Sequence, residues 1–191
     1  MKHLKILFLA FLLTACAKDD KNLIAENQLA NINNKTNFDD IKDLFENDSV
    51  AYTIERDGLG QSLKAKSRII KVYDTSGQNI LIIKPFEISD SVSLVKNIRV
   101  LTDRFKTSNG IGLGSAFSEL KKYHDVSDIQ SSLKSVIINL EDINALVSFD
   151  REVLPGDVRF DMDTDIKPTM IPDDAEINRF WLNFETEENN D

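Results

Sequence analysis

The chain has a single cysteine, Cys16, among its 191 residues. A disulfide needs two thiols, so no bridge can form within the chain. A zinc site built from several cysteines is excluded for the same reason. The fold must therefore rest on its hydrophobic core, and the chain is long enough for one domain of ordinary size.

Histidine and aromatic residues are also scarce. There are two histidines, His3 and His124, and aromatic residues make up 8% of the chain. No serine lies in a G-x-S-x-G motif, and the low aromatic content argues against a sugar-binding cleft. We predict no catalytic residue. The alternative left open is a hydrolase in which His124 acts as base beside a serine or carboxylate that meets it only in space. A histidine at a helix end more often binds the last carbonyl groups.

Basic residues are outnumbered by acidic ones, which gives the chain a net charge of −9. Nucleic acid binding rewards clustered lysine and arginine, so nucleic acid is not an expected partner. The acidic balance also argues against a protein that lies flat on anionic lipid.

No apolar run is long enough to cross a bilayer, which takes roughly 20 residues. The first run, Ile6 to Leu13, is short and follows a basic start with Lys2 and Lys5. A charged start, a short apolar core and small residues before a cleavage site are typical of a secretory signal. We therefore predict a signal peptide over residues 1–15.

The segment Leu13-Thr14-Ala15-Cys16 resembles the lipobox of bacterial lipoproteins. The resemblance implies cleavage before Cys16 and lipid on its sulfur and commonly on its new amino group. Two or more acyl chains, at about 0.8 kcal/mol per buried methylene, give a stable membrane anchor. Loss of Lys2 and Lys5 from 23 basic residues leaves 21 against 32 acidic ones, a net charge of −11. The alternative is a plain signal peptide with a chance cysteine.

The residues after Cys16 resemble a sorting signal. Lys18-Asp19-Asp20 resembles the surface export signal of lipoproteins from the Bacteroidota. Ala17 stands where an aspartate would favour retention at the inner membrane of enterobacteria. We expect an outer-membrane lipoprotein displayed at the cell surface. The simpler interpretation is the solvated start of a tether.

Three further segments follow from composition. Residues 16–36 are rich in Asn, Lys and Asp, which predicts a flexible tether, with a weak helix as the alternative. Residues 37–185 form the predicted single globular domain, and residues 186–191 an acidic tail.

Hydrophobic periodicity predicts an α+β fold within that domain. Helical spacing over 37–46 and 114–123 predicts two short helices. Strand patterns occupy 50–56, 67–74, 79–85, 93–101, 133–140, 144–150 and 177–184, with hairpin signals at 75–78 and 141–143. We expect a mainly antiparallel sheet of about six to seven strands with the helices packed on it.

The stretch Asn109 to Leu120 contains Gly110, Gly112 and Gly114 before a predicted helix with Ser115 as its N-cap. Backbone N–H groups at a helix start can bind an anion. The spacing is that of neither a dinucleotide loop nor a P-loop. The favoured interpretation is a tight turn in which at least one glycine has a positive φ. No cofactor is predicted.

The acidic stretch 161–174 is a weak metal candidate. Asp161, Asp163 and Asp165 alternate, and in a strand they would share one face, with Asp173 or Asp174 completing a cation site. An EF-hand is excluded because its glycine and glutamate positions hold Ile166 and Pro172. The alternative is a solvated acidic segment.

Residues Val95 to Phe184 contain a series of motifs: I-x-V-L, a loop, the G-I-G-L-G-S-A-F-S-E-L helix entry, and Met170 with Pro172-Asp173-Asp174 before the last strand. This series resembles a small family of enterobacterial lipoproteins under envelope-stress control, whose biochemical role is unknown. Pro172 lies two residues after Met170, and the intervening hairpin departs from the family. The resemblance implies an envelope domain and no catalytic residues. We predict a membrane-anchored, non-enzymatic binding or envelope-maintenance protein of unidentified partner. The alternatives are the His124 hydrolase and an inhibitor or immunity module.

Overall fold

The computed structural model describes residues 21–57, 64–86 and 93–185, with the backbone alone described at 55–57 and 64–67. The predicted signal peptide, Cys16, Lys18-Asp19-Asp20 and the acidic tail lie outside the described residues. Among the described residues, no helix has the length and apolar character that a membrane crossing requires.

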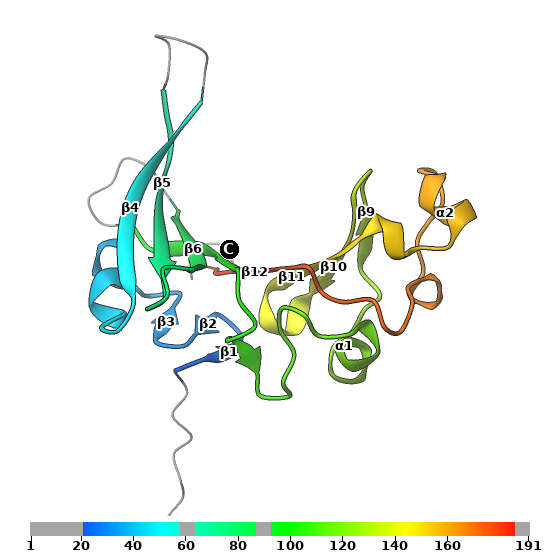
Figure 1. The fold of residues 1–191 in the computed structure, drawn as a ribbon, viewed down its shortest axis with the longest axis horizontal. Helices are drawn as coiled ribbons and strands as arrows, with labels where there is room; N and C mark the ends of the chain where they lie inside the picture. The colour runs from blue at the N-terminus through cyan, green and yellow to red at the C-terminus, as the bar shows by residue number, and fades with distance from the viewer. Residues whose placement is uncertain (1–20, 58–63, 87–92, 186–191) are drawn as a thin grey trace, which may run out of the picture.

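An eight-stranded antiparallel sheet forms the body of the molecule (Figure 1). The last strand lies in the middle of this sheet and joins the strands of the first half to those of the second. In spatial order the strands are β4 (Ser49–Asp57), β5 (Lys64–Tyr73), β6 (Asn79–Pro85), β7 (Val95–Val100), β12 (Arg179–Asn183), β11 (Ala145–Asp150), β10 (Ser135–Leu140) and β9 (Ile129–Ser131).

A second, four-stranded sheet has the order β3-β2-β1-β8. Its strands are β1 (Leu23–Ala25), β2 (Gln28–Leu29), β3 (Ile32–Asn33) and β8 (Lys106–Thr107). The pairing of β1 with β8 is parallel and the other two pairings are antiparallel.

The prediction of a flexible tether over residues 16–36 is wrong for 23–33, which form three of these strands, and so is the helical alternative. Ile24, Leu29 and Ile32 are at most 2% exposed and belong to the core. Asn27 and Ala30 have φ of 50° and 52° and turn the chain between the strands. The asparagine-rich composition reflects tight turns, not a linker. Residues 23–33 therefore belong to the folded domain.

Two short α-helices and four short 3₁₀ helices complete the described part. They are α1 (Phe117–Tyr123), α2 (Gly156–Phe160), η1 (Phe38–Leu44), η3 (Glu141–Ile143), η4 (Arg151–Val153) and η5 (Pro168–Met170). The helix predicted over 37–46 exists as the 3₁₀ helix η1. The Asn37 side chain caps it by accepting a hydrogen bond from the Asp39 N–H at 3.0 Å.

The core lies between one face of the large sheet and a layer made by the small sheet, η1 and α1 (Figure 1). Strand residues that point to this face alternate with half-exposed ones. In β12, Phe180 and Leu182 are fully buried, whereas Trp181 points to the other face and is half-exposed. The α+β class with a mainly antiparallel sheet is confirmed, with more strands than predicted.

Candidate functional site

The glycine stretch forms a tight connection between β8 and α1. Gly110 and Gly114 have φ of 84° and 80°, which confirms the expected positive φ. A Cβ added at Gly112 would lie 2.4 Å from the Phe105 carbonyl oxygen. The positive φ explains why positions 110 and 114 hold glycine, and the lack of space for a Cβ explains why position 112 does.

The backbone N–H groups at the start of α1 already donate to acceptors within the chain. The N–H groups of Phe117 and Ser118 donate to the carbonyl oxygens of Ala175 and Asp173 at 2.8 and 2.9 Å. The prediction of Ser115 as N-cap is wrong, because Ala116 holds that position. Ser115 instead accepts a hydrogen bond from the Gly112 N–H at 3.1 Å. These contacts give the stretch a structural role and leave no free N–H at the start of α1 for an anion.

His124 ends α1 and lies in the interior, 8% exposed. Its Nδ1 is 2.8 Å from a carboxylate oxygen of Asp142. The position of His124 at the helix end suggested that its ring would bind the last carbonyl groups of the helix, but the ring does not. The backbone N–H of His124 donates to the Leu120 carbonyl oxygen. Nε2 is buried and has no hydrogen-bond partner among the described residues. A general base must reach its substrate, so a sealed Nε2 does not favour catalysis.

The acidic stretch does not form a strand. Residues 161–165 are a bend in which the Asp161 carboxylate accepts hydrogen bonds from the Asp163 N–H and the Thr164 hydroxyl at 2.9 and 2.6 Å. These bonds lower the pKa of Asp161 below its ordinary value, the hydroxyl most strongly. The expectation that Asp161, Asp163 and Asp165 share one strand face is therefore wrong. Among the described residues, no group of acidic, histidine or cysteine side chains converges in a way that could hold a metal ion.

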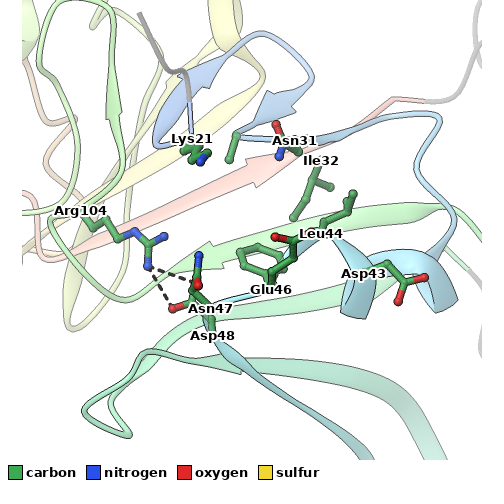
Figure 2. Close-up of a pocket in the computed structure, with 11 residues that line it drawn as sticks. Lys21, Asn31, Ile32, Asp43, Leu44, Glu46, Asn47, Asp48 and Arg104 are labelled. Carbon is green, nitrogen blue, oxygen red and sulfur yellow. Dashed lines mark hydrogen bonds and ion pairs between the residues drawn. The ribbon is translucent and has the colours of Figure 1, made fainter.

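One pocket, of about 310 Å³, lies beside the start of the described chain (Figure 2). Lys21, Asn31 and Ile32 line it on one side and η1 with the residues after it on the other. Arg104 closes one end through an ion pair with Asp48 at 3.2 Å and a hydrogen bond to Asn22 at 2.8 Å. Arg104 and Asp48 thus neutralise each other's charge, which argues that this ion pair has a structural role.

A larger pocket, of about 710 Å³, lies between the β9–β10 hairpin and α2. We call it the hairpin pocket. Its lining is Leu133, Lys134, Asp150, Arg151, Glu152, Arg159, Phe160 and Arg179. Basic side chains outnumber acidic ones here, in contrast to the chain as a whole. Leu133 and Phe160 at the pocket are 79% and 81% exposed, the highest values among the large apolar side chains that the structure describes.

Arg151 holds the two walls of the hairpin pocket together. Its guanidinium donates to the carbonyl oxygens of Ser132 in the hairpin and of Val158, Arg159 and Asp161 around the end of α2, at 2.6 to 3.2 Å. The side chain is 2% exposed. A buried guanidinium with its donors satisfied fixes geometry and is not available to a ligand. Arg179 bonds to the Ser135 hydroxyl at 2.8 Å and stays half-exposed.

Sequence reasoning missed this pocket. Its residues come from three separate segments, around 133, 150–160 and 179, and none forms a recognised motif. The available signal was an apolar residue, Leu133, in a turn between polar residues, together with Phe160 beside acidic residues. Neither is unusual on its own.

No protein-family model matches the chain, and no curated protein matches it. A search of solved structures finds the uncharacterized protein yfeY from Escherichia coli, with a TM-score of 0.54 and 13% sequence identity. The match covers 84% of this chain and 99% of that one. Similarity at this identity shows a shared fold and carries no function across.

Proposed function

We propose that this chain is a lipid-anchored envelope protein that acts by binding another protein, with the hairpin pocket as its binding site. The observation that carries the proposal is the pair Leu133 and Phe160, which expose most of their apolar surface beside a concave, basic surface. Exposed apolar side chains rimmed by charge are typical of interaction sites. The structural likeness to an uncharacterized protein is consistent with this proposal but does not test it.

In this proposal Cys16 carries the lipid anchor, and the protein is located at the outer membrane. Support comes from the lipobox Leu13-Thr14-Ala15-Cys16 and from Lys18-Asp19-Asp20. Surface display is tested by replacing Lys18, Asp19 and Asp20 with alanine. The triple variant should stay in the membrane but become protected from protease added to intact cells. Full protection of the wild type would contradict outward display.

The pocket is tested by pull-down from detergent-solubilised envelopes. We expect the wild type to capture a partner that Leu133→Ser combined with Phe160→Ser no longer captures. Tyr123→Ser is the matched control, because Tyr123 is 51% exposed on α1, away from the pocket lining. Equal capture by all three proteins would contradict the proposed site.

An inhibitor or immunity protein is the second candidate, because such a protein would use the same exposed apolar surface. It differs in its partner, which would be an enzyme or toxin that loses activity on binding. Assaying the captured partner with and without this chain separates the two.

A further inference from the structure

The side of the large sheet away from the core carries a row of side chains that neither the sequence motifs nor the hairpin pocket explains. Register places Lys71 of β5 opposite Ile82 of β6, Ile82 opposite Arg99 of β7, and Arg99 opposite Trp181 of β12. Trp181 is in turn opposite Leu146 of β11. All five are half-exposed, and we call this side the open face.

The middle of the open face is basic although the chain is acidic. Lys71, Lys84, Arg99 and Arg179 point to this face, with Asp150 at the end of β11 among them. Glu141 and Glu185 lie at its edge, where they line a pocket with Asn139 and Asn183. Asp150 accepts a hydrogen bond from the Asn178 side chain and forms no ion pair within the described residues. A face with this composition attracts acidic partners against the net charge of −9.

Arg99 is the centre of the open face. Its guanidinium carbon lies 5.8 Å from the centroid of the Trp181 ring, a cation–π contact. Within the part of the chain that the structure describes, its Nε is buried without a hydrogen-bond partner and its guanidinium forms no ion pair. Arginine and tryptophan are the residue types that contribute most to protein interfaces. Among the described residues, this arrangement places a cation with no acidic partner beside an apolar strip.

The open face continues into the hairpin pocket. Arg179 is two residues before Trp181 on the same face of β12, and it also lines the pocket. In Figure 1, β4 and β5 at one end of the sheet and the β9–β10 hairpin with α2 at the other both rise above the middle strands. A flat bilayer would meet these ends first, so lipid is not the favoured occupant.

We infer that the open face binds an acidic polypeptide, whose carboxylates pair with Lys71, Arg99 and Arg179 and whose apolar side chains lie on Ile82, Trp181 and Leu146. The inference rests on the proposed binding function and names the chemistry of its partner. A sugar polymer is less suited, because the face has one aromatic side chain in this row and not a series of them.

The test uses a labelled glutamate-rich peptide with two phenylalanines, and a twin peptide with glutamine in place of every glutamate. Fluorescence anisotropy measures binding to the full lipidated chain in non-ionic detergent. We expect the glutamate peptide to bind, with an affinity that falls as salt is raised, and the twin not to bind. Lys71→Gln and Arg99→Gln should each weaken binding by about fivefold to tenfold.

Lys122→Gln and Lys167→Gln are the matched controls, because they remove the same charge from exposed lysines outside the open face. Arg99 is half-buried, so melting temperatures are measured for every variant; Lys71→Gln keeps the test decisive if Arg99→Gln does not fold. Wild-type affinity in Lys71→Gln, or equal loss in the controls, would overturn the inference.

Dextran sulfate and phosphatidylglycerol, the lipid added as mixed micelles with the same detergent, are tested as competitors. If either displaces the peptide more effectively than unlabelled peptide does, and depends on Lys71, an acidic polypeptide is the wrong occupant. The Leu133→Ser and Phe160→Ser variant separates the two proposals. Loss of partner capture in that variant, with no effect of Lys71→Gln on peptide binding, would support the pocket and reject the open face. The reverse result would reject the pocket.

Discussion

At the scale of one residue, position 112 requires glycine because no room is left there for a side chain. An added methyl group would lie 2.4 Å from the Phe105 carbonyl oxygen and 2.7 Å from the Lys106 side chain. We predict that Gly112→Ala lowers the free energy of unfolding by about 1–3 kcal/mol, because backbone must shift to relieve the contact. Gly156→Ala is the control: nothing lies within 4 Å of its added methyl, so it should be neutral or slightly stabilising. Urea denaturation measures both, and equal effects would contradict the steric explanation.

Asp161 offers a test of the bend in the acidic stretch. The Thr164 hydroxyl and the backbone N–H of Asp163 hold its pKa below the ordinary value. A lowered folded-state pKa means that this stabilisation is present above the unfolded pKa and is lost as pH falls through the folded one. Thr164→Val should raise the Asp161 pKa toward its ordinary value, as measured by NMR titration. Thr169→Val is the control, and an unchanged Asp161 pKa in Thr164→Val would show that the hydroxyl contact is absent.

At the scale of elements, α2 is too short to be stable alone and depends on Arg151. Lysine cannot reproduce its four carbonyl contacts, because it lacks the planar fork of donors. We predict that Arg151→Lys destabilises the domain by about 2–4 kcal/mol and speeds hydrogen exchange in α2. Arg179→Lys is the control, since within the described residues the Arg179 side chain makes one hydrogen bond, to Ser135. This substitution should cost less than about 1 kcal/mol. Unchanged exchange in α2 would contradict this role for Arg151.

The elements that the sequence predicted correctly are those with strong local periodicity. Strands such as β6, β7, β10 and β11 alternate or run apolar between clear turns, so local pattern determines them. The small sheet was missed because its strands have two or three residues and gain their stability from the burial of Ile24, Leu29 and Ile32. The hairpin pocket and the open face were missed for a related reason. Cross-strand neighbours such as Arg99 and Trp181 are far apart in sequence, and only the register brings them together.

At the scale of the whole molecule, the position of β1 limits how far the domain can stand from a membrane. If Cys16 carries the anchor, seven residue steps separate it from Leu23, the first residue of β1. At about 3.5 Å per residue, a fully extended segment spans roughly 25 Å. The domain would therefore stay close to the bilayer, which favours partners that are themselves at the membrane.

The single cysteine makes the anchor directly measurable. If Cys16 is acylated as proposed, the only thiol in the chain is consumed, so the mature protein, denatured in detergent, should not react with maleimide. It should incorporate labelled palmitate and sediment with membranes. Cys16→Ala should lose the palmitate label and be either unprocessed or released, while Tyr123→Cys in the wild-type background should restore one maleimide-reactive thiol and leave the anchor in place. A denatured wild-type protein that reacts fully with maleimide, or a Cys16→Ala variant that fractionates and acylates normally, would show that Cys16 is not the lipid attachment site.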